Sequence, residues 1–264
     1  MAASEGVDLE HCIVKLLGGT TDGRKFSPKI ESQGKQCADH IKKFAGSRKI
    51  SAWHSDDATN PLKRAIYARP EPKTDIVLQI GGKNYFVSVK MAGPIQLASG
   101  QGSSSAELFR AAAKTSKSNS KVLTSIIEML EDMPTRLLSE SNKARIMSSG
   151  KDKLINEFIK NGKVLTDKSY EFWIKQNKFE LMDAMINYME NDPGFRKELI
   201  REALTGAISL KNYTGATADS IVSPAGFYMI DDSYISKLES KVNFDIRGKS
   251  RGGISGLALR IETR

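Results

Sequence analysis

The stretch from Lys73 to Ala112 reads KTDIVLQIGGKNYFVSVKMAGPIQLASGQGSSSAELFRAA, and it decides the fold. Apolar and polar residues alternate over residues 75–80 and again over 85–91, which is the two-residue period of half-buried strands. The residues between them, Gly-Gly-Lys-Asn, predict a tight turn. We therefore predict a β-hairpin, followed by a Gly- and Ser-rich loop and a helix.

The length of the turn determines which residues of the hairpin face each other. A Gly82-Lys83 loop places Asp75 opposite Lys90, whereas a Gly81-Gly82 loop places it opposite Ser88. In both registers Asp75, Ser88 and Lys90 share one face, and the other face is almost wholly apolar. The pattern indicates either a functional site or an ordinary cross-strand ion pair of Asp75 with Lys90, worth about 0.2–1 kcal/mol.

The order Asp75, turn, Ser88-Val89-Lys90 resembles the PD-(D/E)xK nuclease superfamily. In that superfamily a strand-borne Asp and a (D/E)xK tripeptide on the next strand bind magnesium and the attacking water. This chain has Thr74 where the pattern has Pro, and Ser88 where it has Asp or Glu. The second departure is similar to a variant among type II restriction endonucleases, in which the tripeptide reads SxK and the following helix supplies the acid. Glu107 stands in that helix.

The resemblance implies a Mg²⁺-dependent DNA endonuclease with Asp75, Ser88, Lys90 and Glu107 at its site. Asp75 and Glu107 would hold Mg²⁺, which lowers the pKa of a bound water and neutralises the phosphate. Lys90 would orient that water or stabilise developing charge. Glu107 also has a structural interpretation, because Ser104-Ser105-Ala106-Glu107 matches the capping box that begins many helices.

Two further acids are reserve metal ligands in this interpretation. Glu198 and Glu202 lie four residues apart on a helix predicted over Gly194–Leu204, which Asp192-Pro193 starts and Thr205-Gly206 closes. Like charges at that spacing repel unless a cation answers them. Nearby arginines and a lysine are the alternative partners.

The chain is basic, with 40 Lys and Arg against 31 Asp and Glu and a net charge of +9 over 264 residues. Such a balance suits an anionic partner such as DNA. A glycine-rich loop at 247–253 carries Arg247, Lys249 and Arg251 and is predicted to contact phosphates, with a solvated hairpin loop as the alternative. The loop at 99–105, which contains Gln101, could also receive a phosphate, although flexibility alone explains its composition.

The remaining composition indicates a soluble, cytoplasmic protein without a membrane partner. Cys12 and Cys37 are too few for a disulfide framework or a metal knuckle. No apolar run approaches the roughly 20 residues of a membrane span, and the N-terminus lacks a secretory pattern. A phage origin and a homo-oligomer are both compatible with the sequence.

We predict an α+β fold, an α/β sandwich with a restriction-endonuclease-like mixed sheet and a large helical insertion. Residues 1–115 form the nuclease-like core, 116–206 the helical insertion or subdomain, and 207–264 the C-terminal strands that complete the sheet. Within the core, residues 7–19 read as a short strand or helix, and a helix follows from Ser27-Pro28 to about Ala45.

Two segments of the core are candidates for its first strand, Lys49–His54 and Arg64–Ala68. The loop between them contains Asp56 and Asp57, which with His54 form a candidate metal cluster. A solvated Asp-rich turn is the ordinary interpretation of that loop.

Two other functions stay open. One is a non-catalytic DNA-binding or assembly protein that keeps the nuclease-like core but has lost its metal site. The other is an unrelated α+β interaction protein with a surface ion pair. Ser88 separates the first from the nuclease, since the site is complete only when another acid approaches Asp75.

Overall fold

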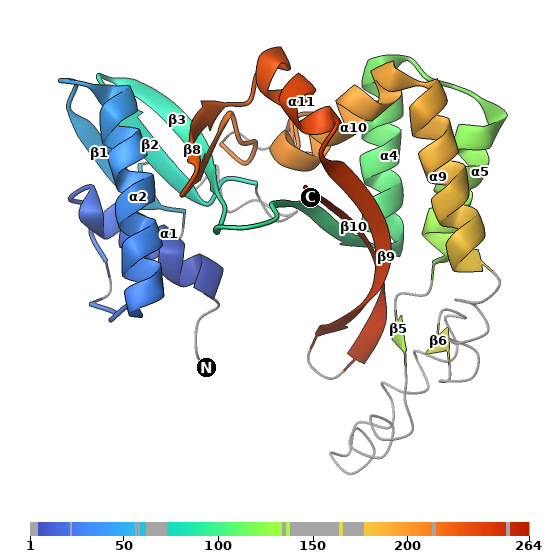
Figure 1. Ribbon diagram of the computed structural model, residues 1–264, viewed down its shortest axis with the longest axis horizontal. Helices are drawn as coiled ribbons and strands as arrows, with labels where there is room; N and C mark the ends of the chain where they lie inside the picture. Colours follow the sequence, from blue (N-terminus) through green and yellow to red (C-terminus); the bar gives the residue numbers. More distant parts are fainter. Residues whose placement is uncertain are drawn as a thin grey trace, which may run out of the picture. The chain divides into compact units, whose positions relative to one another are not determined.

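The computed structural model describes residues 5–21, 23–55, 57, 59–61, 73–133, 136–137, 164–165, 177–212, 215–251 and 254–263. The chain divides into two compact units. The first unit comprises residues 1–95, 200–241 and 263–264, and the second comprises 96–199 and 242–262. Each unit combines helices with a β-sheet, which confirms the α+β class (Figure 1).

A mixed sheet of order β1-β2-β3-β7-β8 forms the centre of the first unit. Strands β1 (Ile50–His54), β2 (Ile76–Ile80) and β3 (Lys83–Val89) are antiparallel neighbours. Strand β7 (Ser220–Ser223) runs parallel to β3, and β8 (Gly226–Met229) returns antiparallel to β7. The hairpin and the first of the two candidate strands are confirmed, while the other candidate, at 64–68, lies outside the described residues.

The turn of the hairpin resolves its register. Ile80 pairs with Lys83, so the loop is Gly81-Gly82. Both glycines have positive φ, 58° and 85°, a backbone region that a Cβ disfavours and that two-residue hairpin turns require. Asp75 therefore stands opposite Ser88, the second of the two predicted registers.

Helices α1 (Glu5–Leu16) and α2 (Pro28–Ala45) pack against one face of this sheet. The segment at 7–19 is thus helical for most of its length. Helix α2 begins where Ser27-Pro28 predicts, because the Ser27 hydroxyl accepts a hydrogen bond from the Ile30 amide and proline occupies the first helical position.

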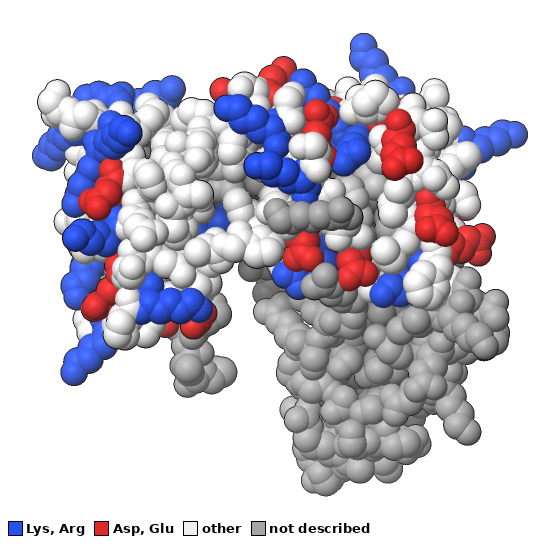
Figure 2. Space-filling view, in the orientation of Figure 1, with Lys and Arg blue, Asp and Glu red and all other residues white. Residues whose placement is uncertain are grey.

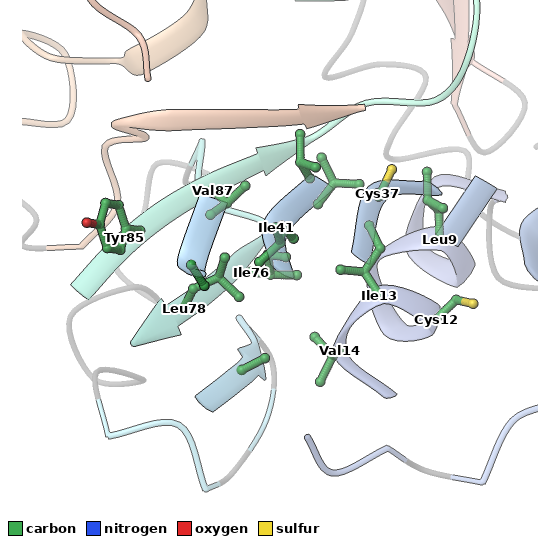
Figure 3. Close-up of a cluster of buried hydrophobic side chains, with 14 of the residues drawn as sticks. Leu9, Cys12, Ile13, Val14, Cys37, Ile41, Ile76, Leu78, Tyr85 and Val87 are labelled. Atoms are coloured by element: carbon green, nitrogen blue, oxygen red, sulfur yellow. The ribbon is translucent and has the colours of Figure 1, made fainter. Parts of the chain in front are cut away.

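The core of the first unit lies between these helices and the apolar face of the hairpin (Figure 3). Burial of each Leu or Ile side chain there contributes about 1.5–3 kcal/mol to stability. Residues shown in Figure 3 include Leu9, Ile13, Val14, Ile41, Ile76, Leu78, Tyr85 and Val87. Cys12 and Cys37 are buried in the same core as free thiols, and burial raises the pKa of Cys37 to about 12.

The two helices can approach closely because α2 carries Gly34 at their contact. A Cβ at Gly34 would lie 2.6 Å from Cys12 Sγ. Because α1 presents Glu10 beside the sheet, this contact also positions a polar residue of the site described below.

The predicted helix at Gly194–Leu204 is confirmed, and α10 (Pro193–Thr205) extends one residue beyond it at each end. Asp192 Oδ1 accepts a hydrogen bond from the Phe195 amide at 2.9 Å, and Gly206 follows the helix with φ 63°. The first unit contains residues 200–205 of α10 and the whole of α11 (Asp232–Glu239).

The second unit contains its own sheet and most of the remaining helices. Strand β10 (Ile254–Thr263) pairs with β4, β5 and β9, and β6 pairs with β5. The other strands are β4 (Gln96–Gln101), β5 (Arg136–Leu137), β6 (Val164–Leu165) and β9 (Val242–Arg251). The helices are α4 (Gly102–Ser116), α5 (Lys121–Asp132) and α9 (Phe179–Asn191).

The predicted domain boundaries differ from this division. Of the C-terminal strands, β7 and β8 complete the first sheet, whereas β9 and β10 belong to the sheet of β4. Helix α4 falls in the second unit and not in the 1–115 core. Strand partners so distant in sequence leave no local pattern, so alternation alone could not assign them. None of the described helices has the length and apolar character needed to cross a membrane.

Candidate functional site

The polar residues of the hairpin gather at one end of the first unit's sheet. Strand β1 ends at His54, β2 begins directly after Asp75, and β3 ends directly before Lys90. Because neighbouring strands run in opposite directions, the end of β1, the start of β2 and the end of β3 lie at the same end of the sheet. Helix α1 adds Glu10, whose Oε2 lies 2.8 Å from His54 Nε2. We call Glu10, His54, Asp75, Ser88 and Lys90 the strand-end cluster.

Asp75 is held by donors from the neighbouring strand. Its Oδ2 accepts a hydrogen bond from the Val89 amide at 2.7 Å and another from the Ser88 hydroxyl at 3.1 Å. Ser88 is 2 % exposed. The residue that departs from the nuclease motif therefore orients the carboxylate of Asp75, and Oδ1 is left for another partner.

Glu10 is held in a comparable way. The side chains of His54 and Glu10 are 4 % and 15 % exposed. When Glu10 is ionised, its carboxylate only accepts hydrogen bonds, and His54 Nε2 is then the donor in this contact. The His54 ring also stacks on His11 with centroids 4.0 Å apart and planes 11° apart.

Burial is the main influence on the ionisation of the two carboxyls of the cluster. Burial raises the pKa of Glu10 to about 7; Asp75 adds to the rise, while His54 and Lys90 oppose it. Burial also raises the pKa of Asp75, against the opposing effects of Lys90, the Val89 amide and Ser88. Two buried carboxylates that repel each other are stabilised by a proton or by a further cation.

The arrangement is not a simple cross-strand ion pair. Asp75 faces Ser88 and not Lys90, and between Asp75 and Lys90, both described, there is no direct ion pair. Lys90 is half-buried, its amide donates to Val222 O at 2.8 Å, and its ammonium acts on both Asp75 and Glu10. The Lys90 ammonium therefore lowers the pKa of both carboxyls of the cluster.

Glu107 occupies a different unit from Asp75. It is exposed on α4 of the second unit, and its role as a metal ligand stays a prediction. Helix α4 already begins at Gly102, directly after β4, so Ser104 lies inside the helix. The predicted capping box of Ser104 with Glu107 is therefore wrong.

The two reserve acids lie on α10. Glu202 is 3 % exposed, and its oxygens accept hydrogen bonds from the Ile208 amide, the Ser209 amide and the Ser209 hydroxyl at 2.9, 2.9 and 2.6 Å. This carboxylate therefore closes the turn that follows the helix. Glu198 is half-buried on the part of α10 that belongs to the second unit.

The predicted phosphate-contacting residues lie in the second unit. Arg247, Lys249 and Arg251 belong to β9, and Gln101 is the last residue of β4. Only Gly252 and Gly253 separate β9 from β10, so the predicted 247–253 loop is mostly strand. The side chains of these four polar residues are outside the described structure, and their DNA contacts stay a prediction.

Of the candidate cluster of His54, Asp56 and Asp57, His54 bonds to Glu10 of α1. Asp57 Oδ1 accepts from the amide and hydroxyl of Thr59, both at 2.8 Å, which is the ordinary Asp turn. Asp56 lies outside the described residues. In the described ranges, no three His, Cys, Asp or Glu side chains are grouped to hold a metal ion by themselves.

Glu10 is the site residue that the sequence analysis missed. It lies three and four residues before Ile13 and Val14, on the buried side of α1. A carboxylate on the apolar side of an amphipathic helix was the available signal.

Comparison of the chain with protein-family models, with curated proteins and with solved structures gave no match. The strand-end cluster is therefore interpreted from its own geometry and charge.

Proposed function

We propose that the protein is a Mg²⁺-dependent DNA endonuclease with a restriction-endonuclease-like core and that the strand-end cluster is its active site. One observation carries the proposal. Glu10 and Asp75 are two partly buried carboxyls whose pKa values are raised. They interact with each other and with the Lys90 ammonium at one end of the sheet. Perturbed acids paired with a lysine in this way are typical of catalytic sites.

The donor set fits magnesium. Mg²⁺ takes oxygen ligands and is commonly held by one or two carboxylates, with waters and substrate phosphate completing its shell. Protein donors engage Asp75 Oδ2 and Glu10 Oε2, which leaves Asp75 Oδ1 and Glu10 Oε1 as the candidate ligand atoms. Glu10 thus takes the part first assigned to Glu107, because it shares a unit and an electrostatic interaction with Asp75.

Each residue has a distinct task in phosphodiester hydrolysis. Magnesium, when bound, neutralises phosphate charge and lowers the pKa of a water ligand. Ser88 and the Val89 amide fix the orientation of Asp75. The Lys90 ammonium orients the attacking water and stabilises negative charge that develops on the phosphate.

The charge of the surface supports DNA as the substrate. Figure 2 shows Lys and Arg side chains gathered along the exposed side of α2 and around the β2–β3 turn. The exposed cations of this region are Lys35, Lys42, Lys43, Arg48, Lys49 and Lys83. Arg48, Lys49 and Lys83 lie at the end of the strands opposite to the strand-end cluster, so these cations support attraction of DNA to the protein and not contacts at the site. With a net charge of +9, the protein attracts a polyanion at a distance.

The decisive test is incubation of supercoiled plasmid with the purified protein in Mg²⁺ and in EDTA. The parent should nick or linearise the plasmid only with Mg²⁺, and Asp75→Asn should not. Asp39→Asn, an exposed acid on α2, is the matched control and should cut like the parent. If the parent protein binds DNA but does not cut it, the nuclease proposal fails and a non-catalytic DNA-binding function takes its place. Ser88, which stands where the motif has an acid, favours that second function.

A further inference from the structure

The geometry points to His54 as a positioning residue that holds Glu10 so that Glu10 and Asp75 bind one divalent cation together. This inference rests on the proposed function, since it concerns the same site. It assigns His54 no contact with substrate or metal.

His54 stands where β1 and β2 are tied at the site. It is the last residue of β1 and pairs with Ile76, the first residue of β2. The next amide, of Ser55, donates to the Asp75 carbonyl at 3.0 Å, and the Asp57 amide donates to the His54 carbonyl at 3.0 Å. The backbone that carries the imidazole is therefore fixed relative to the backbone that carries Asp75.

The imidazole itself is held on both sides. One contact is the 2.8 Å hydrogen bond from Nε2 to Glu10 Oε2, and the other is the stack on His11 at 4.0 Å. His11 directly follows Glu10 on α1, so one turn of this helix supplies both the carboxylate and the ring that limits the movement of His54. The residue therefore connects α1 to the strand end.

A hydrogen-bond donor is needed here for an electrostatic reason. Glu10 and Asp75 repel each other, and a glutamate side chain with three rotatable bonds would relieve this by turning away. The donor at Nε2 opposes that movement and keeps the two carboxylates near each other before a cation arrives. Partners of this kind, outside the ligand shell, commonly change metal affinity by about 10- to 100-fold.

The test compares two variants of similar side-chain volume that differ in the donor. His54→Gln keeps an N–H near the position of Nε2, whereas His54→Met fills the site without a donor. His40→Met is the matched control. His40 lies on α2, outside the strand-end cluster, and its Nε2 bonds to the Pro224 carbonyl at 3.1 Å. Mg²⁺ affinity is measured by calorimetry without DNA, and folding is checked by circular dichroism and Tm in EDTA.

We expect His54→Met to weaken Mg²⁺ binding about 10- to 100-fold, and His54→Gln and His40→Met to stay within about threefold of the parent. Equal Mg²⁺ affinity of the folded Gln and Met variants would overturn the inference, even if the parent cuts DNA and the proposed function stands. A parent that binds Mg²⁺ with this Met–Gln difference but cuts no DNA would support the inference while the proposed function fails. A parent that binds no Mg²⁺ would overturn both.

Discussion

At the scale of single residues, Ser88 changes the meaning of the motif. The superfamily pattern has an acid there, and in this chain the hydroxyl donates to Asp75 while Glu10 of α1 brings the second carboxylate. In the proposed nuclease the second acid therefore comes from another element, and two carboxylates interact with one lysine. Asp75 and Lys90 are then expected to do different work.

We predict that Asp75→Asn loses Mg²⁺ affinity and DNA cleavage together, because a negative ligand is removed. DNA binding should persist or tighten, since repulsion of the phosphate falls. Lys90→Ala should keep Mg²⁺ affinity within a few-fold and lower turnover by about 10²- to 10³-fold. Calorimetry, binding in Ca²⁺ and plasmid cleavage measure the three quantities. Two variants that cut like the parent would rule out the nuclease.

Glu10 makes stability depend on pH in a direction that can be stated. Its pKa is near 4.5 in its ordinary environment and about 7 in the folded protein. Burial is the main cause of the rise; Asp75 adds to it, and His54 and Lys90 oppose it. The folded state therefore binds more protons between these values, and stability falls as pH rises from about 4.5 to about 7. The loss from this group is on the order of 3 kcal/mol.

Glu10→Gln should remove this loss. Relative to the parent, the variant gains free energy of unfolding from pH 5 to pH 8, measured by urea denaturation in EDTA. Mg²⁺ at pH 8 should stabilise the parent by occupying the two carboxylates, and should stabilise the variant much less. A parallel pH dependence of parent and variant would contradict the assignment.

At the scale of elements, α1 and α2 illustrate how packing outweighs propensity. Gly34 lies inside α2, where alanine would be favoured by about 1 kcal/mol as a helix former. The added Cβ would meet Cys12 Sγ at 2.6 Å, an overpacking that typically costs about 1–3 kcal/mol. The cost of overpacking should therefore exceed the gain in helix propensity.

We therefore predict that Gly34→Ala lowers stability by about 1 kcal/mol and weakens Mg²⁺ binding, because α1 shifts and carries Glu10 with it. Cys12→Ala should offset the effect in the double variant, since it removes the sulfur from the contact. Chemical denaturation of both single variants and the double variant measures the coupling. Additive effects would show that the two positions do not meet.

At the scale of the whole molecule, the chain places its candidate chemistry in one unit and a predicted phosphate-contacting strand in the other. The strand-end cluster lies entirely within residues 1–95, and Arg247, Lys249 and Arg251 lie in the second unit. DNA affinity is the property to which both units can contribute. Its salt dependence reports how many phosphates are contacted.

Replacing Arg247, Lys249 and Arg251 by Ala should weaken DNA binding for all sequences and flatten the slope of log K against log salt by up to about 3. Binding is measured by fluorescence anisotropy in Ca²⁺ across a salt series. The control replaces Lys211, Lys237 and Lys241, exposed cations of the first unit, and changes the net charge equally. A slope that matches the control variant would exclude the 247–251 segment.

The sequence by itself determined the features that depend on neighbours in the chain. Alternation over 75–91 predicted the hairpin, and Ser27-Pro28 predicted the start of α2. Asp192-Pro193 with Thr205-Gly206 predicted the bounds of α10 to within one residue. These signals are local, because periodicity, capping and turn chemistry act over a few residues. The turn residues left two possible registers for the hairpin, one with Asp75 opposite Lys90 and one with Asp75 opposite Ser88.

Only the tertiary structure decided which distant residues meet. It placed β10 between β4 and β9, assigned Glu202 to the turn after α10, and brought Glu10 beside a carboxylate 65 residues later in the chain. These outcomes depend on how helices pack on a sheet and which strand edges pair, and such non-local contacts leave no period in the sequence.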